Sequence, residues 1–530
     1  MKLLNLFLAA TLAVGFAACS SDEPAAVNGA ETETTTENND GLYATVKFSF
    51  PQSRSTASEG DEIAKDYESA VNSVLVVTAT KEADGSYKFL TAAYNDAAYV
   101  AGTTTSTYTL YFNNQKALLD QAGKVIFVFA YCNPTPELVT KFCGELDTAT
   151  GKYSGVTEVA DFTDEICGIT DLSSTWRKNG FLMTNVEIVS DTLPSTADLK
   201  KANSPKSAIN LGNIPVIRTA ARFDLKAANS TNSYDIVDPS NHDSIQGTVT
   251  LTQAALFNTR NEFYYLPRTS AENGLCPGMD GMEVENEIVV VTPENRNFSK
   301  MVNPFALDSV DTAYDWTTIS KILGSEDDND DNWVKGDNSE RTDYHIWKYT
   351  TENVLASTSA AELNKQITGV VFEAEITGVT GQSGTLAMYE FEDMMYGNVN
   401  VLYNYVKEAP GSKIEEAFKA TFTGDEGNWT EAEAVNGKTE YAGFTIFRPN
   451  EDGKHNCYYF YYNRHNNDDD PTAIGKMEFA TVRNNVYKLC VTNINKFGTF
   501  TAPDPASYEI YFNVNVEVKP WVVRINDIEF

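Results

Sequence analysis

Apolar and polar residues alternate along many short stretches of this chain, which is the pattern of β-strands with one buried face. The two clearest stretches lie near opposite ends of the sequence. Residues 42–50 place five apolar side chains on one face, namely Leu42, Ala44, Val46, Phe48 and Phe50. Residues 512–518 repeat the pattern with Phe512, Val514, Val516 and Val518. Both stretches are predicted to be strands.

The residues after 518 continue this tail beyond a break at Pro520. Proline cannot donate to a strand ladder, and the apolar row changes parity there. A second apolar row and an apolar chain end follow, made of Trp521, Val523, Ile525, Ile528 and Phe530. The preceding residues 499–507 contain Pro503 and Pro505, which favour an extended tether over a hairpin turn. We therefore expect the segment 499–530 to stand apart from both cores and to pair with another copy of the protein.

Between the two ends, short apolar runs separated by turn residues predict further strands and few helices. The first set covers residues 71–80, 87–93, 108–112, 124–131, 181–189 and 214–225, with short helices at 115–122 and 137–142. The second set covers residues 247–257, 262–266, 369–376, 387–391, 443–447, 457–462 and 485–493. Polar loop residues follow position 225. This spacing predicts a mainly β chain with two β-sandwich domains in series, 55–225 and 226–498.

The first residues indicate export. Lys2 precedes an apolar run at residues 3–16, and small residues lead to Cys19. This resembles a bacterial lipoprotein signal, so residues 1–18 are predicted to be removed and Cys19 to be acylated. Residues 19–41 form a polar linker. Residues 42–54 comprise the first strand and a loop of small residues with a single basic residue, Arg54; such a loop suits an Arg-specific protease, with cleavage between Arg54 and Ser55.

Composition argues against several classes of function. The formal net charge is −34, and an acidic surface of this kind repels nucleic-acid phosphates. The four histidines have no metal-ligand spacing, and the sequence lacks the G-x-S-x-G, H-E-x-x-H and phosphate-loop motifs. We therefore expect no enzyme activity, no cofactor and no bound metal. The six cysteines after Cys19 are expected to be buried thiols rather than zinc ligands.

Several C-terminal motifs resemble those of a known family. One is the stretch 457–498, which begins CYYFYYNRH and includes VRNNVYK at 482–488, and another is KPWVV at 519–523. Weaker matches are FLMTN at 181–185 and RTAAR at 218–222. Together these motifs are similar to the fimbrillins, the major subunits of type V pili, of the short-fimbria type.

This resemblance implies a fold and a mode of assembly. The family looks like two transthyretin-type β-sandwiches, exported as outer-membrane lipoproteins. An Arg-specific surface protease removes the N-terminal strand, and the C-terminal strand of the next subunit fills the groove. The chain would then move from the outer membrane into an extracellular fimbria that supports adhesion or biofilm formation. Its partners would be copies of itself and accessory pilus subunits.

Other functions remain open at the level of the sequence. An anchor or tip subunit of a pilus would share these domains but lack the cleavage or the donor tail. A surface glycan-binding lipoprotein would also account for the signal, the sandwiches and the many aromatic residues. A hydrolase is a more distant alternative, because carboxylates are abundant but no pair of them stands out.

Overall fold

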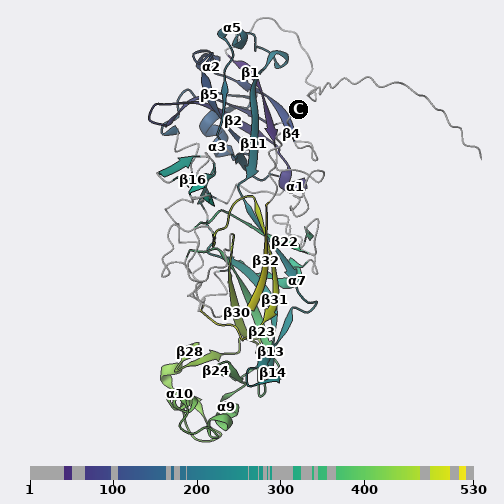
Figure 1. Ribbon diagram of the computed structural model, residues 1–530, viewed down its shortest axis with the longest axis vertical. Helices are drawn as coiled ribbons and strands as arrows, with labels where there is room; N and C mark the ends of the chain where they lie inside the picture. Colours follow the sequence, from purple (N-terminus) through teal and green to yellow (C-terminus); the bar gives the residue numbers. More distant parts are fainter. Residues whose placement is uncertain are drawn as a thin grey trace, which may run out of the picture. The chain divides into compact units, whose positions relative to one another are not determined.

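A computed structural model describes residues 41–49, 66–96, 105–162, 169–171, 180–186, 188–260, 262–271, 274–277, 283–284, 287–288, 314–323, 337–338, 344–354, 366–465, 478–501 and 512–520. The chain is mainly β with short helices, as the alternating pattern predicts (Figure 1). Cys19, Phe50, Arg54, Ser55 and residues 521–530 lie outside the described part. Among the described residues, no helix is long and apolar enough to cross a membrane.

An N-terminal sheet is built mostly from the first set of predicted strands. Its order is β3-β2-β5-β9-β11-β1-β4, and β10 pairs with β5. The strands are β1 (Leu42–Ser49), β2 (Val74–Lys81), β3 (Tyr87–Asn95), β4 (Thr105–Phe112), β5 (Val125–Cys132), β9 (Met183–Asn185), β10 (Val189–Thr192) and β11 (Ile209–Arg218). Alternation along β2 sends Val74 and Val76 into one apolar cluster and Leu75 and Val77 into another. Both faces of this sheet therefore carry a core.

Short helices and small strand pairs complete the N-terminal region. The helices are α1 (Asp66–Ser69), α2 (Gln115–Leu119), α3 (Pro136–Cys143), α5 (Thr196–Leu199) and the 3-10 turn η2 (Pro205–Ser207). Helix α3 begins where Thr135 accepts a hydrogen bond from the backbone N–H of Leu138. The small pairs are β6 (Leu146–Asp147) with β7 (Lys152–Tyr153), and β8 (Ile169–Asp171) with β15 (Glu262–Tyr264).

The C-terminal region contains two five-stranded sheets. One has the order β21-β22-β12-β31-β32, and its strands are β21 (Asp337–Asn338), β22 (His345–Thr350), β12 (Ala221–Ala227), β31 (Asn485–Ile494) and β32 (Phe512–Pro520). The other has the order β13-β14-β23-β30, with β20 paired to β14; its strands are β13 (Ser233–Asp238), β14 (Asn241–Phe257), β23 (Gly369–Thr377), β30 (His455–Tyr462) and β20 (Thr317–Thr318). One apolar cluster draws residues from both sheets, including Phe223, Leu489, Val249 and Phe372. These sheets form a sandwich.

Further small elements lie between β15 and β22 in the sequence. They are the hairpin β16 (Arg268–Ala271) with β17 (Gly274–Pro277), the pair β18 (Glu283–Val284) with β19 (Glu287–Ile288), and helix α7 (Ile319–Ile322). Helix α7 begins at Thr318, whose side chain accepts a hydrogen bond from the backbone N–H of Lys321.

Two strand predictions need correction. The run 214–225 forms two strands, because the chain leaves the N-terminal sheet after Arg218 and enters the C-terminal one at Ala221. Backbone hydrogen bonds hold the crossing, with Thr219 N–H donating to the carbonyl of Leu182. The run 181–189 likewise splits into two strands, β9, which pairs with β5 and β11, and β10, which pairs with β5. The apolar residues correctly predicted extended backbone, but they did not show where one strand ends and the next begins.

A module between β23 and β30 was not predicted as a unit. Ile376 and His455 are paired neighbours in the sheet, yet residues 378–454 intervene. The module contains β24 (Met388–Phe391), β25 (Met394–Tyr396), α9 (Val399–Val406), α10 (Lys413–Thr421), β26 (Phe422–Thr423), β27 (Thr430–Glu431), η5 (Glu433–Val435), β28 (Glu440–Tyr441) and β29 (Phe444–Phe447), seen together in Figure 1. It has its own apolar cluster, which includes Leu402, Phe418 and Ile446.

One carboxyl in this module predicts a pH dependence of stability. Burial and the nearby Asp393 raise the pKa of Glu390 from 4.5 to about 7, while Lys496 opposes the shift. The folded chain therefore holds this proton more tightly than the unfolded chain does. Stability should decrease as the pH rises from 4.5 through about 7. We expect Glu390→Gln to reduce the loss of melting temperature between about pH 5 and pH 8, measured by calorimetry. The exposed control Glu408→Gln should leave that loss unchanged, and an equal effect of both variants would contradict the assignment.

Candidate functional site

The candidate site is the position of β1 in the N-terminal sheet. β1 lies between β4 and β11 (Figure 1). It pairs antiparallel with β4 over its whole length, from Leu42 opposite Phe112 to Ser49 opposite Thr105. It pairs parallel with β11, from Ala44 opposite Ile209 to Ser49 opposite Pro215, with an irregularity between Thr45 and Lys47. β1 is therefore an interior strand, with ladders on both sides.

The inward face of β1 is completely covered. Leu42, Ala44, Val46 and Phe48 are each 0 % exposed and belong to one apolar cluster. The ring of Phe48 meets that of Tyr108 edge to face, with centroids 5.3 Å apart. Burial of the three larger side chains contributes on the order of 5–9 kcal/mol as an upper bound. Total domain stabilities are only about 5–15 kcal/mol, so an empty groove would have to be refilled.

The outward face of β1 is polar and partly exposed. Thr45 Oγ1 donates to the carbonyl of Ile209 at 3.2 Å, and Ser49 Oγ donates to Asn213 Oδ1 at 2.8 Å. The rings of Tyr43 and Tyr111 lie 5.0 Å apart. Specificity for an occupant of this groove would therefore come mainly from its inward row.

Residues 50–65, which contain Arg54, connect β1 to α1. Just after this connection, Glu68 is held by a buried ionic cluster. Arg222 Nη1 donates to Glu68 Oε1 at 3.0 Å, and Tyr349 donates to the same oxygen at 2.6 Å. Arg222 also pairs with Asp224 at 2.8 Å. The backbone carbonyl of Glu68 accepts from Arg218 Nε at 2.7 Å. A cut within residues 50–65 would leave the downstream chain anchored to both regions.

Sequence reasoning missed this cluster. A signal was present, because Arg218, Arg222 and Asp224 interrupt an otherwise apolar run. Charges in such a run are rarely buried unless they are paired. The carboxylate partner lies far away in the sequence, at Glu68, and only the folded chain reveals it.

Removal of the central guanidinium should be strongly destabilising. Arg222→Leu leaves the buried carboxylates of Glu68 and Asp224 without their cation, and we expect a loss of about 3–5 kcal/mol in urea unfolding. The control is Lys201→Ala, which removes an exposed ion pair to Asp198. That variant should leave the free energy of unfolding nearly unchanged, because solvent screens an exposed ion pair. Equal losses in the two variants would contradict the role assigned to the cluster.

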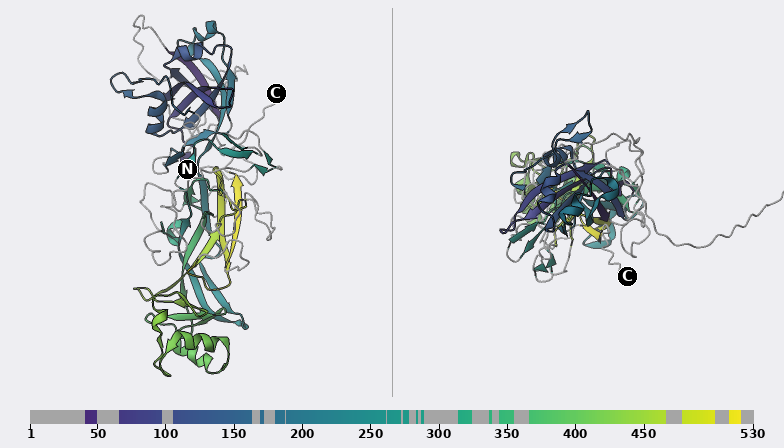
Figure 2. Two further views of the ribbon diagram at one scale, coloured as in Figure 1. Left: turned by 90° about the vertical axis from the view of Figure 1, so that its left-hand side faces the viewer. Right: turned by 90° about the horizontal axis from the view of Figure 1, so that it is seen from above.

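The predicted tail strand is present as β32. Its backbone pairs antiparallel with β31, from Phe512 opposite Ile494 to Pro520 opposite Asn485. Among the residues that the structure describes, β32 is the outermost strand of its sheet and pairs with β31, and Figure 2 shows it in yellow at the edge of the sheet. The expectation that the tail stands apart from both cores is therefore wrong for its first strand. β31 pairs with β12 on one side and with β32 on the other.

β1 and β32 belong to different sheets of the same chain. The structure does not bring Phe512, Val514, Val516 and Val518 next to Leu42, Ala44, Val46 and Phe48. An exchange of one strand for the other would therefore have to involve two copies of the protein.

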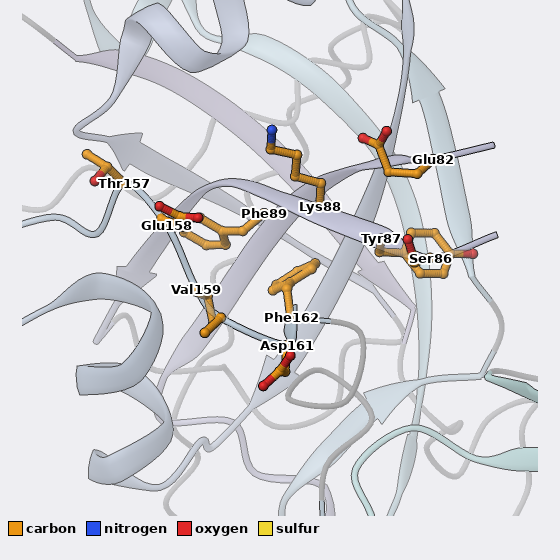
Figure 3. Close-up of a pocket in the computed structure, with 11 residues that line it drawn as sticks. Glu82, Ser86, Tyr87, Lys88, Phe89, Thr157, Glu158, Val159, Asp161 and Phe162 are labelled. Atoms are coloured by element: carbon orange, nitrogen blue, oxygen red, sulfur yellow. The ribbon is translucent and has the colours of Figure 1, made fainter. Parts of the chain in front are cut away.

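A separate pocket of about 610 Å³ lies in the N-terminal region beside β3 (Figure 3). The charged side chains of Glu82, Lys88, Glu158 and Asp161 line it together with Phe89, Phe162 and Tyr87. The three aromatic side chains are only 3–5 % exposed. Sugars stack on exposed ring faces, and these rings are packed within the core. The pocket therefore gives no specific support to the glycan-binding alternative.

Two histidines have polar partners within the fold. His455 is 0 % exposed, with Nε2 2.8 Å from the carbonyl oxygen of Leu386. His465 packs against Tyr487, and burial lowers its pKa to about 4. These two histidines are structural rather than surface residues. The described thiols of Cys132, Cys143, Cys457 and Cys490 are free and buried, as expected.

Comparison with known proteins gives the family. Residues 453–527 match the model of the major fimbrial subunit protein type IV, fimbrillin, C-terminal. The C-terminal region of this chain matches the fimbrillin family. The matched segment includes β31 and β32 and the motifs VRNNVYK and KPWVV. No protein of curated function matches the chain.

Solved structures show more distant likenesses to this chain. A proposed cell adhesion protein from Parabacteroides distasonis is 13% identical, with a TM-score of 0.40, covering 91% of this chain and 98% of its own. The tip fimbrial protein Mfa3 from Porphyromonas gingivalis, with a C-terminal truncation, is 12% identical, with a TM-score of 0.36 and coverage of 91% and 100%. A fimbrilin, FimA, from the same organism is 15% identical, with a TM-score of 0.36 and coverage of 91% and 98%.

Proposed function

We propose that this chain is a structural subunit of a cell-surface fimbria, not an enzyme, and that its copies polymerise head-to-tail by strand exchange. The chain is exported as an outer-membrane lipoprotein through Cys19. An Arg-specific surface protease cuts between Arg54 and Ser55, and the segment containing β1 leaves. The C-terminal strand of another copy then occupies the vacated groove. The resulting extracellular fimbria supports adhesion or biofilm formation and joins accessory pilus subunits.

The observation that carries this proposal is the placement of β1. An interior strand with four fully buried side chains is connected to α1 through a segment that contains Arg54. Cleavage there would break the covalent link between β1 and the rest of the sheet. The chain beyond the cut would stay in place, because Glu68 is anchored to Arg222 and Tyr349.

Once β1 has left, movement of the tail strand into the groove is favourable in terms of backbone pairing. β32 is paired along one side only, against β31, whereas the groove offers ladders to both β4 and β11. An extended segment that adds to a sheet gains main-chain hydrogen bonds, and its alternate side chains fill the pockets. Movement of the strand into the groove would replace one ladder with two.

The placement of donor and acceptor also favours a filament. Because the groove and the donor strand belong to different sheets of one chain, each copy can donate to one neighbour and accept from another. Such a contact is heterologous, and a heterologous contact that does not close into a ring propagates as a fibre.

N-terminal sequencing of the protein recovered from assembled surface fibres tests the proposal. We expect the sequence to begin at Ser55, with residues 42–49 absent from the washed fibres. If normal-length fibres consist of chains that still begin at Cys19, the proposal is wrong. A protein that stays monomeric after complete cleavage at Arg54 would also overturn it.

Delivery to the membrane should depend on Cys19. Cys19→Ala removes the thiol that the lipid would modify, so we expect loss of incorporated fatty-acid label and of surface exposure. Metabolic labelling with a fatty-acid analogue measures the first, and protease accessibility on whole cells measures the second. Ser20→Ala serves as the control and should be labelled normally. Undiminished labelling of the Cys19 variant would refute the lipoprotein assignment.

A further inference from the structure

We infer that residues 512–518 of a second copy fill the β1 groove in the chain direction opposite to that of β1, so that Phe512 takes the place of Phe48 and Val518 that of Leu42. This inference rests on the proposed function, because it needs β1 to leave. It adds the register and the direction of the incoming strand, which follow from the sizes of the pockets.

The four inward positions of β1 differ in size. In chain order they hold Leu42, Ala44, Val46 and Phe48, all 0 % exposed. The largest pocket therefore lies at the C-terminal end of β1, where Phe48 meets the ring of Tyr108. The smallest lies at Ala44. Protein interiors are close-packed, so an occupant must present its largest side chain at the Phe48 end.

The tail contains a stretch with the same alternation as β1. Phe512 comes first, and three valines follow at alternate positions, with Asn513, Asn515 and Glu517 between them. The last ten residues keep the pattern less well. Val522 stands between the apolar residues of the second row, and that row would continue at Asp527. Residues 512–518 are therefore the better match to a groove with one apolar and one polar face.

The two possible directions place these side chains differently. In the opposite direction, Phe512 enters the Phe48 pocket and Val514 enters the Val46 pocket, so both positions keep their residue type. Val516 is larger than Ala44 by two carbon atoms and Val518 is smaller than Leu42 by one, so these two positions together gain one carbon atom.

In the same direction, Val518 would enter the Phe48 pocket and leave a cavity beside Tyr108. Phe512 would meanwhile be forced into the smaller Leu42 pocket. Cavities and overpacking both cost stability. The pocket sizes therefore select the opposite direction.

The neighbouring strands accept this direction. β1 runs parallel to β11 and antiparallel to β4. An incoming strand of opposite direction would run antiparallel to β11 and parallel to β4, and both pairings provide regular hydrogen-bonded ladders. The reversal exchanges the type of the two ladders and keeps a partner on each side.

Disulfide trapping between copies distinguishes the two directions. Opposite β1, Thr107 of β4 faces Lys47 and Tyr111 faces Tyr43. The opposite direction places residue 513 at the Lys47 position, and the same direction places it at the Tyr43 position. The donor variant is Asn513→Cys, and the matched acceptor variants are Thr107→Cys and Tyr111→Cys.

Full-length donor and acceptor chains are mixed, cut with an Arg-specific protease and oxidised, and disulfide-linked dimers are measured on non-reducing gels. Each single variant alone provides the background from native thiols. We expect the 513–107 pair to give at least about tenfold more linked dimer than the 513–111 pair, because the opposite direction places residue 513 beside residue 107 and four positions along β4 from residue 111.

The possible outcomes separate this inference from the proposed function. A stronger 513–111 product would overturn the direction and leave strand exchange intact. If fibres form but neither disulfide-linked dimer is found, residues 512–518 do not occupy the groove. Polymerisation itself would not be contradicted by that result. If the cleaved wild-type chain forms no fibres at all, the proposed function fails and the inference fails with it.

Discussion

Arg54→Ala is expected to leave the chain as a monomer that retains its N-terminal strand. Without the cut, β1 keeps its ladders to β4 and β11, and its inward side chains stay fully buried. A donor strand would have to displace an interior strand whose burial is worth on the order of 5–9 kcal/mol. We therefore expect at least about a hundredfold decrease in fibres, measured as high-molecular-weight ladders on gels of unboiled samples.

The matched control restores the cleavage site one residue earlier. Ser53→Arg combined with Arg54→Ala supplies an arginine in the same loop, and we expect both cleavage and ladders to return. This control separates loss of the cut from an unrelated effect of the substitution. Ladders of wild-type abundance from the uncleaved Arg54→Ala chain would show that β1 does not block assembly.

Deletion of residues 512–530 is expected to abolish polymerisation while both regions remain folded. The deletion removes β32, which is an edge strand paired only with β31. The sandwich core formed by residues of β12, β14, β23 and β31 remains. We expect a soluble monomer with a cooperative unfolding transition, a modest decrease in melting temperature from the lost ladder, and no fibres after cleavage.

A pair of point variants tests the same step without removing the strand. Val516→Asp places a charge on the apolar row of the donor strand, and burial of an unpaired charge in the groove is costly. Asn515→Asp adds the same charge to the polar row. We expect the first variant to stop assembly and the second to leave it nearly unchanged, both measured by fibre yield. An insoluble deletion variant, or equal fibre yields from the two point variants, would contradict the donor role of β32.

The local pattern of the sequence was sufficient to predict many elements. Alternation identified β1 and its buried face, because the side chains of a strand point alternately to opposite sides. The strands predicted at 71–80 and 87–93 are present as β2 and β3, which pair with each other, and the short helix predicted at 137–142 is present as α3. The motifs of residues 457–498 identified the fimbrillin family, which the match over residues 453–527 supports independently.

The tertiary structure decided the partner of each strand. The sequence did not reveal that β1 pairs with β11, which lies more than 150 residues away, or that β32 pairs with β31 in the same chain. It also did not show that Arg222 reaches Glu68, or that residues 378–454 form a module between adjacent strands. The physical reason is that alternation depends only on neighbouring residues, whereas pairing depends on pocket sizes, burial and hydrogen-bonding partners supplied by distant segments.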